Sequence, residues 1–120
     1  MKCMVFVKAT KDSEKGTLPT AELMAAMGKF NNELIEAGIM KGGGGLKPTT
    51  QAKRVHFSGA QRTVVNGPFS PPEEQVSGYW LWEVKSMDEA VEWLKKCPMP
   101  MLVDSDIEIR QEYGPEDFAG

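Results

Sequence analysis

The run from Gly78 to Lys85 is the most strand-like segment of the chain, and it constrains the fold more than any other. It reads Gly-Tyr-Trp-Leu-Trp-Glu-Val-Lys, and large aromatic and aliphatic side chains suit a pleated surface. Because side chains alternate along a strand, Trp80, Trp82 and Val84 would face helices, while Tyr79, Leu81 and Glu83 would face a partner or line a cleft. Glu83 is therefore expected as a carboxylate on an otherwise apolar face.

The remaining elements follow from periodicity and from capping residues. The expected segments are a strand at Lys2–Ala9, a helix at Ala21–Ala37, a hairpin of Lys53–Phe57 and Arg62–Val65, a helix at Met87–Cys97 and a strand at Asp106–Glu112. Thr20 and Ser86 are placed to cap the two helices. The four glycines at 42–45 are interpreted as a flexible or tightly turning crossover. A phosphate-binding loop is disfavoured because Lys47 is followed by Pro48 and no helix begins there.

This order of strand, helix, hairpin, strand, helix and strand matches the β-α-β-β-α-β pattern of a ferredoxin-like α+β sandwich. We expect one domain over residues 1–120, an antiparallel sheet with helices on one face, and an exposed tail at 113–120. The other face would carry Met4, Phe6, Tyr79 and Leu81. A sheet face this apolar predicts pairing into a homodimer.

Composition excludes several function classes. The net charge of −3 favours neither nucleic acid nor an anionic membrane, and no apolar run is long enough to span a bilayer. Two cysteines without a signal peptide suggest a reduced, cytoplasmic protein. His56 is the only histidine, so neither a metal site nor a haem enzyme is expected, and no cofactor is predicted.

Three charged residues stand out on the predicted strands. In the usual strand order of this fold, Lys8, Glu83 and Arg110 would lie on adjacent strands, on the face away from the helices. They would then form an ion-pair network inside a dimer interface, which is the favoured interpretation. The alternative is a pocket for a small anionic ligand, with Lys8 or Arg110 as anchor and Glu83 as general base.

Several motifs, in this order and spacing, resemble those of the YCII-related proteins that carry a DGPF motif. They are Asn66-Gly-Pro-Phe69, Gly78-Tyr-Trp-Leu-Trp-Glu-Val84, Met87-Asp-Glu-Ala-Val-Glu-Trp93 and Ile107-Glu-Ile-Arg110. The resemblance implies a dimeric ferredoxin-like α+β barrel. Most members have no assigned activity; some relatives look like lactone dehalogenases or isomerases, and others are encoded near sigma factors.

The chain departs from the pattern of this family at its loop acids. The aspartate of the motif is Asn66 here, and two further acidic positions are occupied by Gly44 and Pro71. A family chemistry that relies on these acids is therefore lost or moved to Glu83. Asn66 to Phe69 is interpreted first as a structural clip and second as a wall of a ligand cleft.

Two functional hypotheses follow. The first is a protein that binds a small anionic metabolite in a cleft between the sheet face and the Asn66 loop, with possible lyase- or isomerase-like chemistry. Its catalytic residue would be Glu83, and its ligand-binding residues Lys8, Asn66, Gly67, Phe69, Tyr79, Trp82 and Arg110. The second is a non-catalytic dimeric regulatory or interaction module, associated with transcription, that uses the exposed tail. Whether the protein is an enzyme stays open.

Overall fold

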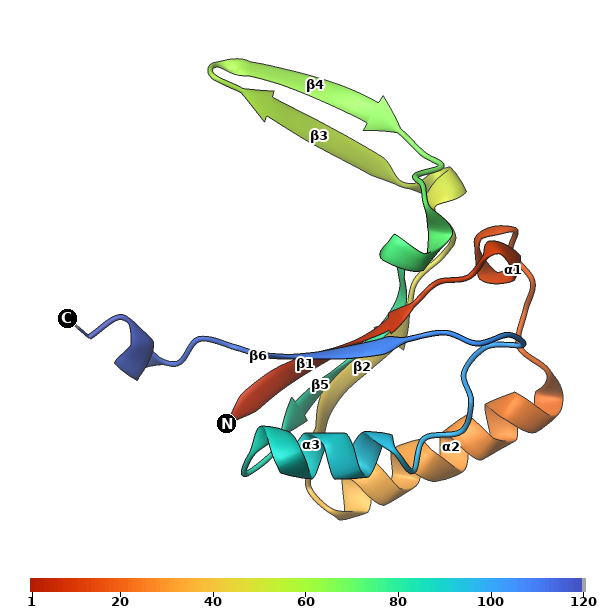
Figure 1. The fold of residues 1–120 in the computed structure, drawn as a ribbon, viewed down its shortest axis with the longest axis vertical. Helices are drawn as coiled ribbons and strands as arrows, with labels where there is room; N and C mark the ends of the chain where they lie inside the picture. Colours follow the sequence, from red (N-terminus) through yellow and green to blue (C-terminus); the bar gives the residue numbers. More distant parts are fainter. Residues whose placement is uncertain (120) are drawn as a thin grey trace.

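A four-stranded antiparallel sheet, in the order β2-β5-β1-β6, forms the centre of the computed structural model, which describes residues 1–119 (Figure 1). Its strands are β1 (Lys2–Lys8), β2 (Met40–Gly45), β5 (Val76–Glu83) and β6 (Ile107–Gln111). The strands β3 (Lys53–Ser58) and β4 (Gln61–Asn66) pair only with each other. The helices are α1 (Lys11–Glu14), α2 (Ala21–Glu36) and α3 (Met87–Leu94), with 3-10 turns η1 (Thr49–Gln51), η2 (Pro72–Glu74) and η3 (Pro115–Asp117).

Both predicted helix starts are confirmed by their caps. The Thr20 hydroxyl accepts a hydrogen bond from the Leu23 amide at 3.1 Å, and the Ser86 hydroxyl accepts one from the Glu89 amide, also at 3.1 Å. Each bond satisfies one of the amides that a helix start leaves without an intrahelical partner. α3 ends at Leu94, three residues earlier than predicted, and its C-cap is Lys95.

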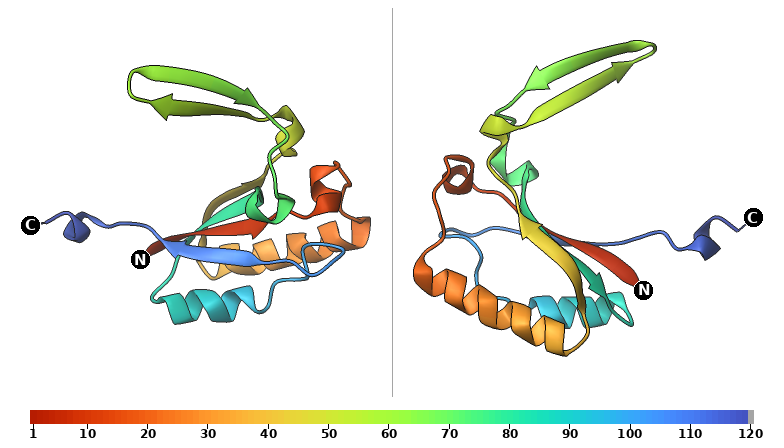
Figure 2. Two further views of the ribbon diagram at one scale, coloured as in Figure 1. Left: turned by 45° about the horizontal axis from the view of Figure 1, so that its top comes forward. Right: turned by 180° about the vertical axis from the view of Figure 1, so that it is seen from behind.

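α2 and α3 cover one face of the sheet, and the core lies between them and the strands (Figure 2). Trp82 is fully buried and Trp80 nearly so, as the predicted alternation requires. The Phe30 ring of α2 meets the Trp80 ring edge-on, with centroids 5.8 Å apart. Burial of this apolar and aromatic surface stabilises the packing of the two layers.

The opposite face of the sheet is apolar and carries no helix. Phe6 pairs with Tyr79 and Met4 pairs with Leu81 across β1 and β5, and all four side chains are only half-buried. Figures 1 and 2 show α2 and α3 on one side of the sheet and the β3–β4 hairpin on the other. The fold is thus the expected ferredoxin-like α+β arrangement, with an apolar face left open.

Two expectations about the sheet are wrong. The glycines at 42–45 are not a crossover, because they form most of β2, the edge strand next to β5. The predicted hairpin, β3–β4, does not join the four-stranded sheet. It projects as a separate arm in which every residue is exposed. Glycine has no side chain to pack and therefore weakens a strand. The glycines of β2 are explained by the atoms and the space next to them.

The C-terminal segment extends away from the sheet beyond β6 (Figure 1). Its two aromatic residues, Tyr113 and Phe118, are exposed and lie with ring centroids 5.1 Å apart. Gly120, the last residue of the predicted tail, lies outside the described residues. Within residues 1–119, no helix has the length and apolar character needed to cross a membrane.

Candidate functional site

A cleft of about 790 Å³ lies beside the edge strand β2. Its walls come from α1, from the N-terminal half of α2, from β2 and from the loop at residues 100–102, with β5 behind them. Most of the lining is apolar side chain or glycine, including Leu23, Met24 and Met27 of α2. A concave, mainly apolar cavity with a few polar groups is the usual form of a small-molecule site.

Two glycines keep this cleft open. A Cβ placed on Gly28, in the middle of α2, would meet no atom within 4 Å, and the same holds for Gly45 on β2. Both residues line the cleft. Glycine inside a helix costs about 1 kcal/mol relative to alanine. Gly28 therefore lowers the stability of α2, at a position where a side chain would occupy the cavity.

Gly43 has a different reason to be glycine. A Cβ at this position would lie 2.8 Å from the Tyr79 carbonyl oxygen and 3.0 Å from Cδ1 of Trp80. β2 therefore packs too closely on β5 for any side chain here. This close approach accounts for the glycine at position 43 of the run.

The Trp80 indole links α2 to the sheet behind the cleft. Its Nε1 donates a hydrogen bond to Oδ1 of Asn31 at 2.9 Å. Both residues line the cleft. Because Oδ1 is the acceptor, the Asn31 amide nitrogen keeps its two hydrogens for other partners.

The α1 wall is tied to the rest of the molecule by Glu14. Its carboxylate accepts hydrogen bonds from the Thr49 amide, at 3.1 and 3.3 Å, and from the Thr49 hydroxyl. The Thr49 hydroxyl in turn accepts one from the Phe69 amide at 2.9 Å. Hydrogen bonds to an ionised carboxylate are about twice as strong as neutral ones, so Glu14 joins α1 firmly to η1 and to the loop at residues 66–69.

The Asn66–Phe69 loop forms the base of the hairpin arm. The Gly67 amide donates to the Ala52 carbonyl at 2.9 Å, and a Cβ on Gly67 would overlap the Thr49 carbonyl oxygen. Asn66 Oδ1 accepts from the Lys53 ammonium at 2.7 Å. None of Asn66, Gly67 and Phe69 lines the cleft. These contacts agree with the clip interpretation. The loop reaches the cleft wall through Thr49, which bonds to both Phe69 and Glu14.

The expected cluster of Lys8, Glu83 and Arg110 does not form in residues 1–119. The register pairs Glu83 with Lys2, at the far end of β1 from Lys8, which corresponds to about 20 Å along the strand. The Lys8 ammonium donates to the Glu74 carbonyl instead, at 3.1 Å. Arg110 pairs across β6 and β1 with Met4. Within residues 1–119 the three side chains therefore make no ion pair with one another, and a network across a dimer interface stays a prediction.

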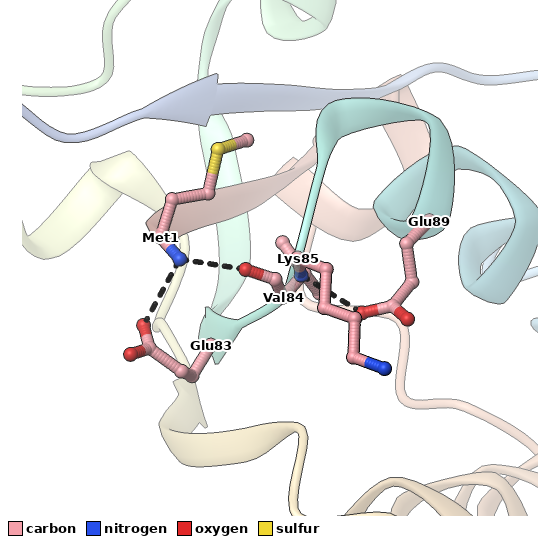
Figure 3. Close-up of polar contacts among 5 residues, drawn as sticks. All are labelled: Met1, Glu83, Val84, Lys85 and Glu89. Carbon is pink, nitrogen blue, oxygen red and sulfur yellow. Dashed lines mark hydrogen bonds and ion pairs between the residues drawn. The ribbon is translucent and has the colours of Figure 1, made fainter.

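Glu83 has a different cationic neighbour, the N-terminus (Figure 3). The Met1 ammonium lies 3.9 Å from Oε2 of Glu83 and donates to the Val84 carbonyl at 2.6 Å. This contact holds Met1, the residue before β1, against the end of β5. Glu83 does not line the cleft, and its proposed role as general base stays a prediction.

The two predicted aromatic ligand residues lie in different environments. Tyr79 lines the cleft, where the Gly44 Cβ position is 3.6 Å from its hydroxyl oxygen. Trp82 is fully buried between the sheet and the helices, and its Nε1 has no hydrogen-bond partner within the described residues. Its indole has no exposed surface through which to contact a ligand.

The thiols and the histidine do not add chemistry to the cleft. Burial raises the pKa of the Cys97 thiol to about 11, and burial also raises the pKa of Cys3. Both thiols therefore stay protonated near neutral pH, where only the thiolate is a strong nucleophile. His56 is exposed on β3 of the arm, and residues 1–119 contain no group of three His, Cys, Asp or Glu able to hold a metal ion.

Sequence reasoning missed most of the cleft. Asp12, Asn31 and Lys47 line it but were not among the predicted site residues. Gly28 offered a signal, because a glycine inside an amphipathic helix that is otherwise well formed usually has a packing or functional reason. Asn31 offered no such signal, because in the sequence it cannot be distinguished from an ordinary asparagine on the surface of a helix.

Comparison with known proteins places the chain in context. The family model described as YCII-related domain matches residues 1–110. An uncharacterized protein of Rhizobium meliloti (strain 1021) is 30% identical over 73 residues, which are 61% of this chain and 59% of that protein. This chain therefore matches less than two thirds of that relative.

A solved structure shares the fold. It is 5-chloro-2-hydroxyhydroquinone dehydrochlorinase from Burkholderia phenoliruptrix AC1100, in complex with 2,5-dihydroxybenzoquinone. The two chains are 17% identical, with a TM-score of 0.50, over 97% of this chain and 98% of the other. At this identity the likeness establishes the arrangement of strands and helices.

Proposed function

The chain belongs to the YCII-related domain family, and we propose that it binds a small organic molecule in the cleft between α2 and the glycine strand β2. The observation that supports this most directly is the cavity itself, about 790 Å³ with mainly apolar walls. This volume is within the range of cavities that hold small-molecule ligands. Gly28 and Gly45 line it without side chains, at a cost in the stability of their elements.

The cleft can hold an anionic group, but not through the residues that sequence suggested. Neither Lys8 nor Arg110 lines it, whereas Lys47 does. Asp12 and Glu14 lie on the α1 wall. The charge of Glu14 is compensated by its hydrogen bonds from Thr49. We therefore place the negative or electron-rich end of the ligand toward β2 and Lys47.

Lyase- or isomerase-like chemistry would need a proton acceptor at the ligand. Asp12 lines the cleft, and its carboxylate has no hydrogen bond or ion pair with residues 1–119. Glu83 lies on the open face of the sheet. Asp12 is thus the better-placed base for a reaction in this cleft, and Glu83 would serve only a site on the open face. The dehydrochlorinase with this fold gives general support to elimination chemistry.

We also propose that the protein is a homodimer that covers the open sheet face. Met4, Phe6, Tyr79 and Leu81 form a half-buried apolar strip on that face. The hairpin arm on the same side exposes Phe57 at 66% and Val64 at 59%. Exposed apolar surface of this kind marks protein contacts, and it is also what supports a non-catalytic interaction module. Sedimentation of the wild type and of Leu81→Glu tests the pairing, since the charge should yield monomers.

Binding is tested by isothermal titration calorimetry with a panel of neutral and anionic ring compounds that includes 2,5-dihydroxybenzoquinone. The informative variant is Gly28→Leu, because Gly28 lines the cleft and a Cβ there would meet no atom within 4 Å outside the neighbouring helix backbone. Ala25→Leu is the matched control, because it adds a larger side chain at an exposed position of the same helix. We expect binding by the wild type and the control and its loss in Gly28→Leu. Equal binding by all three proteins, or no binding by any, contradicts the proposal.

A further inference from the structure

We propose that the cleft recognises a flat cyclic ligand through an acceptor oxygen, a ketone-type carbonyl or a deprotonated hydroxyl, which receives hydrogen bonds from the Asn31 amide and from backbone N–H groups at the free edge of β2. This inference rests on the binding function proposed above and names the class of ligand. Its donors come from two consecutive elements, α2 and β2.

The free edge of β2 presents backbone donors at Gly43 and Gly45. The Leu46 amide bonds to the Ser77 carbonyl, and the Glu83 amide bonds to the Ile39 carbonyl, so the odd-numbered residues of β5 are those that pair with β2. In an antiparallel pair, hydrogen-bonded and non-hydrogen-bonded residues alternate. The register pairs Gly43 with Trp80 and Gly45 with Gly78, which are even-numbered. The N–H and C=O groups of Gly43 and Gly45 therefore point away from β5.

This edge is reachable because it has no side chains. β2 is the outermost strand of the sheet, and Gly43 to Gly45 are exposed and line the cleft. Proteins usually cover or charge such an edge, because its unpaired groups bind other strands. A run of glycines does the reverse and lets a ligand approach the backbone closely.

Asn31 supplies a side-chain donor beside the same edge. Its Oδ1 accepts from Trp80 Nε1 at 2.9 Å, which orients the amide so that its nitrogen faces other partners. Cδ1 of the same indole lies 3.0 Å from the Cβ position of Gly43. Trp80 therefore contacts both Asn31 and the glycine strand and holds their donors on one side of the cleft.

The rest of the lining suits the face of a ring. Leu23, Met24 and Met27 provide apolar surface from α2, and methionine adapts well to flat ligands. Gly28 leaves free space among them. Donors gathered at one edge and apolar surface along one wall fit a planar ring that carries an oxygen at its rim.

The test compares 1-tetralone with tetralin, which has the same two rings but no oxygen, by calorimetry on the full chain. Asn31→Asp is the informative variant, because it keeps an acceptor for Trp80 Nε1 and replaces the two donors by a carboxylate oxygen. We expect the wild type to bind 1-tetralone about tenfold tighter than tetralin. The variant should lose this preference and bind tetralin as the wild type does.

A second pair of variants tests the backbone donors without touching Asn31. Gly45→Pro removes one outward N–H, which proline tolerates at an edge strand, whereas Gly45→Ala adds a methyl group and keeps the N–H. We expect Gly45→Pro to bind 1-tetralone about tenfold more weakly than Gly45→Ala, because both fill the same space and only proline removes the N–H. Thermal melts of each variant confirm that the fold is intact.

The two proposals fail in different ways. Equal affinity of the wild type for 1-tetralone and tetralin, with Gly28→Leu abolishing both, overturns the recognition of an oxygen and leaves the cleft as a binding site. An undiminished preference for 1-tetralone in both Asn31→Asp and Gly45→Pro likewise overturns the proposed donors. Absence of binding by either probe and by 2,5-dihydroxybenzoquinone overturns both proposals.

Discussion

Two glycine-containing segments, residues 42–45 and residues 66–69, use the missing side chain for opposite purposes in the structure. The first forms an edge strand and lines the cleft. The second forms the base of the hairpin arm and is packed against Thr49. At Gly45 a side chain would meet open space, whereas at Gly67 it would overlap a carbonyl oxygen. Glycine thus provides access in one segment and close packing in the other.

The contrast shows why a glycine motif does not reveal its own role. A missing side chain lets another atom approach, and that atom can belong to a ligand or to the protein itself. The cost of restoring a Cβ distinguishes the two cases. Substitutions at these glycines, and at the Glu14 carboxylate that bonds to Thr49 beside the second segment, therefore test the comparison directly.

The largest effect is expected for Gly67→Ala. The new Cβ cannot fit beside the Thr49 carbonyl, so the loop must move away and lose its hydrogen bonds to Ala52 and Thr49. We expect the free energy of unfolding to fall by about 3 kcal/mol or more in urea denaturation. Gly45→Ala is the control and should change it by less than about 0.5 kcal/mol. Similar values for both would remove the distinction between the segments.

Glu14→Ala should have the next largest effect. It removes three hydrogen bonds to the carboxylate and leaves the Thr49 amide and hydroxyl without that partner. We expect a loss of about 2 kcal/mol in the free energy of unfolding. Asp12→Ala, in the same short helix, removes a carboxylate that bonds to no described residue, and it should change stability little. Hydrogen exchange at Phe69 should rise in Glu14→Ala only.

Gly43→Ala should cost about 1–2 kcal/mol, because its Cβ would press on the Tyr79 carbonyl and the Trp80 ring. The same segment would then contain one glycine needed for packing and one, Gly45, that tolerates alanine. Urea denaturation of the two single variants measures the difference. A neutral Gly43→Ala would mean that β2 can move away from β5 without loss.

The smallest expected effect has the opposite sign. Gly28→Ala should stabilise the protein by about 0.5–1 kcal/mol, because alanine is the better helix former and its Cβ meets nothing outside the helix. Gly28 thus belongs with Gly45, as a glycine that keeps space free. A higher melting temperature together with weaker ligand binding would confirm that Gly28 lowers stability and leaves room for the ligand. Destabilisation by alanine would contradict it.

Local signals predicted most of the secondary structure. Thr20 and Ser86 cap the helices as expected, and the alternation around Trp80 and Trp82 places both on the helix-covered face. These features depend on residues within a few positions of each other, so they can be found without knowledge of the fold. The motif at Asn66 was likewise identified as a clip, although its partner Thr49 was not foreseen.

The predicted site residues and the lining of the cleft differ because the arrangement of the cleft depends on register. Lys8 and Glu83 were expected together, but pairing of Glu83 with Lys2 sets them apart, and Tyr79 is the one predicted site residue that lines the cleft. Asn31 became informative only through its bond to Trp80, 49 positions away in the sequence.

The sequence by itself determined the family, the starts of the two long helices, and which face of β5 is buried, since capping and side-chain alternation act over short distances. Only the tertiary structure decided that the hairpin stands apart from the sheet, that the glycine run is its edge, and that the cleft opens beside α2. These depend on which strand pairs with which, and in what register, and such pairing joins residues that are distant along the chain.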